Sequence, residues 1–332
     1  MDGLFSQWVA TDAWRDEATT WIGDELAAVG RQMTGEVEQR RIRSWSTQLV
    51  VPTDRGTVWF KGNCPALAFE PAVHRALASL EPDEVDDPLA IDDARGWMMT
   101  ADRGATLGDS RDATLEDWQA VVRLAATLQR RVAGEGSTLR RAGLPDCSPS
   151  TVPARYQWLI EQLAALPGDH PSHLTDDVRA ELEAGVSVVE DAVETLSAAR
   201  LPVTLQHGDL HPRNVFAVGS SLRMFDFGDA QWAHALEMLA VPYGYVTRLT
   251  THPWPAVLSA YAQVWSDVID PVELETLMTP AMVTHAVNRS FTWLGSVVGA
   301  QPHELAEWGD SPLYYLKLAL QPFPPEDPEQ GP

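Results

Sequence analysis

The spacing of apolar residues predicts helices at the start of the chain and strands after residue 37. Between Phe5 and Met33, apolar side chains recur at helical intervals with polar residues between them. This period predicts an amphipathic helix, or a pair of helices, packed on a core. From Glu38 the runs EQRRIRSW, TQLVVPT and TVWFKG are typical of short strands, and Asp54–Gly56 is a turn signal between the last two.

A helix and two further strands complete this first region. Residues 66–80, ALAFEPAVHRALASL, have a helical pattern, and PLAIDD and RGWMMTAD are strand-like. The pattern therefore predicts a helical extension over residues 1–36, followed by a small antiparallel sheet with one helix over residues 37–100.

Helical segments dominate residues 101–320. One begins after a cap-like Thr114, a second is ARYQWLIEQLAAL, and a third runs from Thr175 to Arg200. The strand-like runs PVTLQHGD, NVFAV and LRMFDFG interrupt this pattern, and helices are expected to resume at Trp232. Residues 321–332 are rich in proline and acidic side chains, which predicts a disordered tail.

Composition narrows the class of protein. The chain has 332 residues, enough for about two domains or lobes. Its net charge of -23 disfavours binding to nucleic acids or anionic membranes and would attract a cationic small molecule. No run approaches the ~18 apolar residues of a membrane span, and Cys64 and Cys147 suggest neither a zinc site nor a disulfide. A cytoplasmic protein is expected, with its oligomeric state left open.

The stretch QHGDLHPRNVFAVGSSLRMFDFGDA carries the candidate chemistry. His207 and Asp209 are followed by Asn214, and Asp226 begins a DFG sequence after two strand-like runs. Carboxylate and amide oxygens are the ligands that Mg²⁺ prefers, so Asn214 and Asp226 are candidate metal ligands. Asp209 lies close enough in sequence to orient an attacking hydroxyl, and His207 to hold the loop backbone. This spacing is that of a kinase catalytic loop and its metal-binding segment.

A partner lysine lies upstream of this stretch. Lys61 and Lys317 are the only lysines of the chain, and Lys61 ends the predicted strand TVWFK. Glu70 follows in the next predicted helix. A strand lysine held by a helix glutamate is the arrangement that places a positive charge on nucleotide phosphates.

The sequences HGDLHPRN and DFGDA resemble those of the aminoglycoside phosphotransferase and choline kinase family, the small-molecule branch of the protein-kinase-like fold. Gly208 stands where protein kinases have arginine, and in this respect the sequence resembles the small-molecule branch. The resemblance implies an α+β, two-lobed fold, with a small antiparallel-sheet N-lobe and a mostly helical C-lobe. It also implies Mg²⁺ and ATP or GTP, and a small-molecule hydroxyl as the phosphate acceptor.

The same resemblance implies a role for each matching residue. Asp209 would be the catalytic base, supported by His207, and Asn214 and Asp226 would bind Mg²⁺. Lys61 would contact the phosphates, held by Glu70. The segment Met98–Ala101 would be the hinge whose backbone meets the nucleobase, which assigns Met99, Thr100 and Ala101 to nucleotide binding.

The predicted phosphate-covering loop departs from the protein-kinase pattern. Its sequence is RSWSTQ, without glycine, so backbone N–H groups and the hydroxyls of Ser44 and Ser46 would have to contact the phosphates. Trp45 would leave less room there. Ser46 is the residue assigned to the nucleotide.

Several other residues invite a functional role. Asp229 would either face a cationic acceptor or cap a helix, and Glu237 is a weaker candidate of the same kind. His211 is expected to pack or to be solvated. Five tryptophans could form a cage for a quaternary amine, but their helical spacing favours core packing: Trp232, Trp254, Trp265, Trp293 and Trp308.

The sequence thus predicts a kinase that transfers a nucleotide γ-phosphate to a small-molecule hydroxyl. An aminoglycoside fits the acidic composition, and a sugar, an amino alcohol or a macrolide fits the resemblance equally well. A nucleotide-binding pseudokinase is the alternative of another class, suggested by the glycine-free loop. A protein kinase is disfavoured because no A-P-E segment follows DFG.

Overall fold

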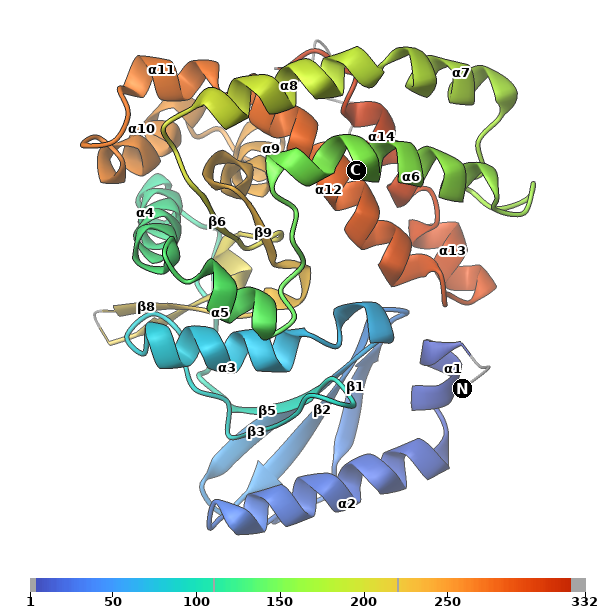
Figure 1. The fold of residues 1–332 in the computed structure, drawn as a ribbon. Helices are drawn as coiled ribbons and strands as arrows, with labels where there is room; N and C mark the ends of the chain where they lie inside the picture. The colour runs from blue at the N-terminus through green and yellow to red at the C-terminus, as the bar shows by residue number, and fades with distance from the viewer. Residues whose placement is uncertain (1–3, 110, 220, 324–332) are drawn as a thin grey trace.

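The computed structural model describes residues 4–109, 111–219 and 221–323. It consists of a smaller lobe built on a sheet and a larger helical lobe (Figure 1). The sheet has the strand order β1-β2-β3-β5-β4 and every neighbouring pair is antiparallel. Its strands are β1 (Glu38–Ile42), β2 (Ser46–Thr53), β3 (Gly56–Asn63), β4 (Ala90–Asp92) and β5 (Trp97–Ala101).

Helices lie on both sides of this sheet. The predicted N-terminal pair is α1 (Phe5–Val9) and α2 (Asp12–Ala28), and α2 buries an apolar stripe that includes Trp14 against Phe60 and Trp97. On the opposite side, α3 (Glu70–Leu80) lies between the sheet and the helical lobe (Figure 1). The segment predicted as one helix from residue 66 begins with a 3-10 turn, so Glu70 is the first residue of α3.

The long helix α12 is central to the helical lobe, where it packs against α6, α8 and α14. Thr114 caps α4 through a reciprocal pair of hydrogen bonds with Asp117, as the sequence predicts. The segment from Thr175 is two helices that meet at Gly185, whose φ of -82° and ψ of 0° depart from helical values. The helices are α4 (Leu115–Val132), α5 (Gly136–Arg141), α6 (Val152–Ala164), α7 (Asp176–Ala184), α8 (Val186–Ala198), α9 (Ala240–Leu249), α10 (Trp254–Val264), α11 (Pro271–Thr276), α12 (Met278–Val297), α13 (Pro302–Trp308) and α14 (Ser311–Leu318).

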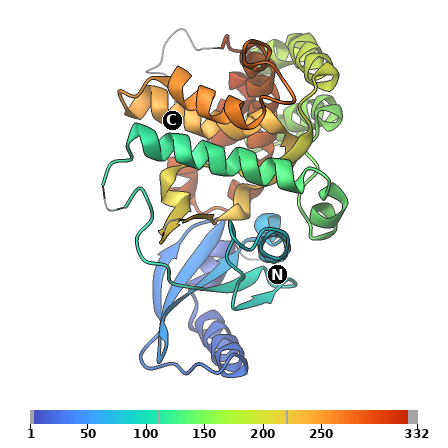
Figure 2. The same ribbon diagram turned by 90° about the vertical axis from the view of Figure 1, so that its left-hand side faces the viewer.

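Two short strand pairs lie where the two lobes meet (Figure 2). β7 (Val215–Val218) and β8 (Ser221–Met224) form the hairpin expected between the two motifs. β6 (Val203–Gln206) pairs with β9 (Gln231–His234), so the prediction that helices resume at Trp232 is wrong. All four residues of β9 are buried and their backbone completes the pairing with β6, which outweighs local helical preference. A 3-10 segment, Ala235–Leu239, then leads into α9.

The predicted C-terminal tail lies mostly outside the described residues. Residues 321–323 are within the described chain, whereas the rest of the predicted disordered segment, residues 324–332, lies outside it. In the described part of the chain, no helix is both long enough and apolar enough to cross a membrane.

Candidate active site

The loop between β6 and β7 holds Asp209 through the side chains that the sequence singles out. His207 is fully buried, and its Nε2 donates to the Phe225 carbonyl at 2.9 Å while its Nδ1 accepts from the Asp209 N–H at 3.3 Å. Asn214 Nδ2 donates to the Asp209 carbonyl at 2.8 Å and to its carboxylate Oδ2 at 3.3 Å. The loop is therefore tied to the start of the DFG segment by a histidine and to itself by an asparagine.

Only glycine fits at position 208, where the loop that carries Asp209 runs close to the DFG segment. The Gly208 φ of +83° lies in the left-handed region, and a Cβ at this position would lie 2.0 Å from the carbonyl oxygen of Asp229. No side chain fits there without moving one of the two segments. The close approach explains why this loop has no counterpart of the protein-kinase arginine.

Lys61 links the two lobes through two carboxylates. Its Nζ lies 2.6 Å from Glu70 Oε2 and 2.6 Å from Asp226 Oδ1, and the Glu70 side chain is fully buried. Burial alone would lower the pKa of Lys61, but Asp226 and Glu70 outweigh it and raise that pKa. Burial raises the pKa of Glu70, whereas Lys61 overcomes burial at Asp226 and lowers its pKa. The three residues thus form one compact charged group with an excess of carboxylate.

Asn214 and Asp226 offer the oxygen donors that suit Mg²⁺. The Asn214 amide nitrogen faces Asp209, which leaves its Oδ1 as the atom for a metal, and the Phe225 N–H donates to the Asn214 carbonyl at 3.2 Å. Asp226 adopts a left-handed φ of 65°, a conformation that is uncommon outside glycine. Within the described ranges, no group of three His, Cys, Asp or Glu side chains has metal-binding geometry.

The loop predicted to cover the phosphates is only the three residues Arg43–Trp45, between β1 and β2. Ser46 is fully buried on β2, and its hydroxyl accepts from Arg41 Nη2 at 3.2 Å. Trp45 reaches across to the helical lobe, where its ring lies edge-on to Trp293 and Trp308, each with centroids 5.7 Å away. This loop has no glycine, and aromatic contacts with the helical lobe fix its position.

The predicted hinge residues lie within the sheet. Met99 is fully buried on β5, and its carbonyl accepts from the Leu89 N–H at 2.7 Å. Thr100 and Ala101 pair with Trp59 and Val58 of β3. Thus the carbonyl of Met99 is already paired, and the three residues are not among those that line the cavity described next.

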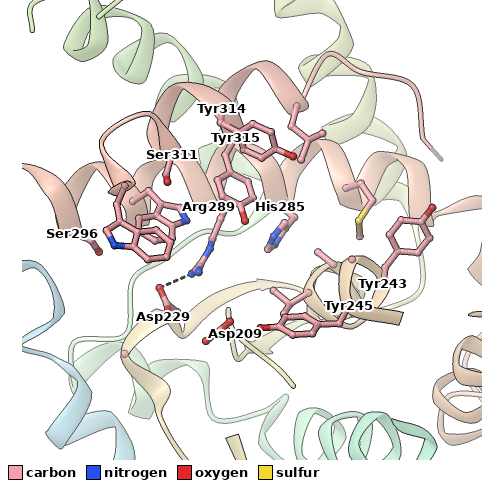
Figure 3. Close-up of a pocket in the computed structure, with 18 of the residues that line it drawn as sticks. Asp209, Asp229, Tyr243, Tyr245, His285, Arg289, Ser296, Ser311, Tyr314 and Tyr315 are labelled. Carbon is pink, nitrogen blue, oxygen red and sulfur yellow. Dashed lines mark ion pairs between the residues drawn. The ribbon is translucent and has the colours of Figure 1, made fainter. Parts of the chain in front are cut away.

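A cavity of about 990 Å³ extends from Lys61, Asp226 and Asp209 into the helical lobe. Figure 3 shows its far end, where side chains from α9, α12 and α14 converge above Asp209. Aromatic residues dominate this end: Tyr243, Tyr245, Trp293, Trp308, Tyr314, Tyr315 and Phe323. The expectation of core packing is correct for Trp232 and Trp265, which are buried, but not for Trp293 and Trp308, which line the cavity.

Asp229 and Glu237, the two candidate substrate contacts, have different surroundings. Asp229 lines the cavity, where its Oδ1 lies 2.5 Å from Nη1 of Arg289 on α12 (Figure 3). Glu237 is fully buried outside the cavity lining, and its carboxylate accepts from Thr284 Oγ1 at 2.8 Å and Asn288 Nδ2 at 2.9 Å. Asp229 is thus placed at the far end of the cavity, whereas Glu237 bonds the 3-10 segment to α12.

Sequence reasoning missed Arg289, and it assigned packing or solvation to His211. The His211 ring packs on Tyr245 with centroids 5.1 Å apart, and its Nε2 lies 3.3 Å from Asp209 Oδ2. Although burial opposes it, His211 and Arg289 lower the pKa of Asp209. Arg289 carried a signal in the sequence, because α12 contains no other Lys, Arg, Asp or Glu. A lone charged residue in such an apolar helix needs a partner or a ligand.

Comparisons with solved structures define the class of fold. The chain aligns with a Plasmodium vivax ethanolamine kinase at a TM-score of 0.63 and 10% identity, over 85% of this chain and 82% of the other. It aligns with a macrolide 2'-phosphotransferase type I at a TM-score of 0.58 and 13% identity, over 90% and 97%. It aligns with a spectinomycin phosphotransferase, solved with ADP and spectinomycin, at a TM-score of 0.54 and 11% identity, over 90% of this chain and 97% of the other. The fold is that of the protein-kinase-like small-molecule kinases.

The sequence itself gives the family. A family model described as the phosphotransferase enzyme family matches residues 38–275. The chain therefore belongs to the phosphotransferase enzyme family, which confirms the resemblance drawn from its motifs. No curated protein sequence matches the chain.

Proposed function

We propose that this protein transfers the γ-phosphate of ATP or GTP to a hydroxyl group of a small molecule. The observation that carries the proposal is the continuity of the cavity. Lys61 and Asp226, paired across the two lobes at 2.6 Å, line it together with Asp209 and the aromatic acceptor end. A nucleotide phosphate at Lys61 and a hydroxyl at Asp209 would therefore share one cavity. A cytoplasmic location, where such nucleotides are plentiful, belongs to the same proposal.

Asp209 is proposed to accept the proton of the attacking hydroxyl, or to orient it. It is held as a carboxylate by its lowered pKa, and the His207 and Asn214 bonds fix its direction. Lys61, positioned by Glu70, is proposed to bind the phosphates. Mg²⁺, held by Asn214 and Asp226, would neutralise the charge of the transferring phosphoryl group. These roles use positioning and electrostatics, which supply most of the catalysis in phosphoryl transfer.

The pseudokinase alternative rests on the glycine-free loop. Trp45 is anchored by two tryptophans, so the loop is held by packing rather than left without support. Lys61, Asp209, Asn214 and Asp226 are also all present. Both points favour catalysis over regulation by nucleotide binding alone.

The proposal is tested by measuring nucleoside diphosphate release with Mg·ATP and with Mg·GTP. The acceptor panel contains aminoglycosides, macrolides, hexoses, amino sugars, choline and homoserine. Asp209→Ala is expected to abolish acceptor-dependent release while Mg-nucleotide binding persists. Asp191→Asn, an exposed carboxylate on α8, is the matched control and is expected to behave as the wild type.

Two results would count against the proposal in different ways. Acceptor-dependent release that survives Asp209→Ala would overturn the role of Asp209. Tight Mg-nucleotide binding without release for any acceptor would favour the pseudokinase alternative.

A further inference from the structure

Arg289 is a buried cation with unused hydrogen-bond donors. Only 8% of the residue is exposed, and Asp229 is its ion-pair partner. Its Nη1 is engaged in that ion pair, whereas its Nε makes no hydrogen bond to any residue that the structure describes. Its guanidinium also lies over the Trp293 ring, 5.3 Å from the centroid. Buried guanidinium donors without acceptors are costly, which suggests that a ligand completes this group.

The rest of the cavity lining shows the same imbalance. Its other buried atoms without a partner among the described residues are Arg41 Nε, Trp293 Nε1, Trp308 Nε1 and Tyr314 Oη. Each of them carries a hydrogen that it can donate, and the indole and guanidinium nitrogens cannot accept. Among the buried lining atoms that have no partner, donors therefore outnumber acceptors, and a ligand rich in acceptor oxygens would satisfy them.

The charges at the acceptor end do not favour a polycation. The buried carboxylate there, Asp229, is already neutralised by Arg289, and a second arginine, Arg248, also lines this end. Of the other acidic residues beside this end, Glu307 and Asp310 are exposed, where water solvates them, and Asp209 is the residue assigned to the attacking hydroxyl. An ammonium group placed beside Arg289 would bring donors to donors and a positive charge to a positive charge.

We propose that the acceptor is an uncharged, oxygen-rich alcohol with an apolar or aromatic body, and that Arg289 donates hydrogen bonds to one of its oxygens. The aromatic walls would cover the apolar body, and Arg289 would hold the reactive hydroxyl near Asp209. Asp229 balances the guanidinium charge, so the pair recognises hydrogen-bond acceptors rather than net charge. This inference rests on the proposed function, because it identifies the acceptor of that same site.

The test uses two probes that differ in one substituent. Phenyl β-glucoside is uncharged, rich in hydroxyl oxygens and carries an aromatic ring, and its 2-amino-2-deoxy analogue replaces one hydroxyl with an ammonium group. Binding of each to the Mg·ADP-loaded protein is measured by isothermal titration calorimetry at millimolar concentration, with kanamycin as the polycation. We expect the glucoside to bind at least about 10-fold more tightly than either amine.

The Arg289→Lys variant shows whether Arg289 is the recognising group. It keeps the charge beside Asp229, so the fold is expected to survive, but it removes the donor fork. We expect glucoside affinity to fall about 10- to 100-fold, as for loss of a charge-assisted hydrogen bond, with Mg·ADP affinity unchanged. Arg130→Lys is the matched control, because Arg130 also pairs with a carboxylate, Asp267, and lies 5.2 Å from the centroid of a tryptophan ring, remote from the cavity.

The outcomes separate this inference from the proposed function. Tighter binding of either amine, no glucoside binding, or full glucoside affinity in Arg289→Lys would each overturn the inference. Because these are binding measurements, they do not depend on turnover. If the expected order is found but no acceptor ever yields ADP, recognition by Arg289 stands and phosphoryl transfer falls. If an amine is phosphorylated instead, transfer stands and the inference falls.

Discussion

Two cation–carboxylate groups flank Asp209, and their charge balance differs. On the nucleotide side, Lys61 faces both Glu70 and Asp226, so carboxylates outnumber cations. On the acceptor side, Arg289 faces Asp229 alone, and the charges cancel. The first group retains the negative charge that a metal ion needs, whereas the second retains only N–H donors. Two aspartates three positions apart in DFGDA thus serve opposite ends of one cavity.

The largest expected effect comes from removing the carboxylate of the nucleotide side that is assigned to the metal. Asp226→Ala leaves Lys61 with one partner and deprives Mg²⁺ of its charged ligand. We expect Mg²⁺-supported ATP binding to weaken at least about 100-fold, measured by calorimetry with and without Mg²⁺. Asp267→Ala, which removes a surface carboxylate paired with Arg130, is the control. Equal Mg·ATP affinity in Asp226→Ala and wild type would show that the metal assignment is wrong.

A smaller effect on turnover is expected when one of the two carboxylates that face Lys61 is neutralised. Glu70→Gln makes Lys61 and Asp226 a one-to-one pair, like Arg289 and Asp229. Lys61 should then compete more strongly with Mg²⁺ for Asp226. We expect kcat to fall about 10-fold and the Mg²⁺ concentration for half-maximal rate to rise, measured in a Mg²⁺ titration. An unchanged Mg²⁺ requirement would mean that the carboxylate excess has no bearing on the metal.

The aromatic contact between the two lobes is tested at Trp45. Trp45→Leu removes its edge-on contacts with Trp293 and Trp308, each worth about 0.5–1.5 kcal/mol beyond buried area. We expect the KM of the acceptor to rise about 5- to 30-fold with a smaller change in kcat. Trp158→Leu, on α6 with an edge-on contact to Phe291, is the control, because Trp158 does not line the cavity. A kcat effect without a KM effect would place Trp45 in the chemical step instead.

The last prediction concerns stability rather than activity, at a carboxylate with no ion-pair partner among the described residues. Burial raises the pKa of Glu237 from 4.5 to about 7. Between these pH values the native state holds a proton that the unfolded state has lost, so this contribution to stability is complete below pH 4.5 and falls as pH rises toward 7. The loss amounts to about 3 kcal/mol.

Glu237→Gln removes this titration. We expect the variant to match the wild type near the acidic end of that range and to be more stable above it, in urea unfolding followed at both pH values. Equal pH dependence of the two proteins would show that Glu237 is ionised in the native state.

The meeting of Lys61, Glu70 and Asp226 was predictable from sequence because these residues follow fixed intervals in recognisable motifs. Lys61, Glu70 and Asp226 lie where strand, helix and DFG patterns place them, and the strand predictions of the small lobe are confirmed. The acceptor side was not predictable in this way. Arg289 comes 60 residues after Asp229, on a helix whose orientation is set by packing against α6, α8 and α14. No local pattern records such a contact.

Tertiary contacts also explain where a prediction from local sequence was wrong. Gln231–His234 forms a strand because β6 supplies its partner.

The three tryptophans at Trp45, Trp293 and Trp308 also give the protein an optical signal of its own. Trp293 and Trp308 are stacked with centroids 5.6 Å apart, and Trp45 meets both from the other lobe. Indoles at such separations couple their electronic transitions, so a change in the Trp45 contact would alter the near-ultraviolet circular dichroism. The approach of the two lobes can therefore be followed without a label, and Trp45→Leu provides the blank spectrum.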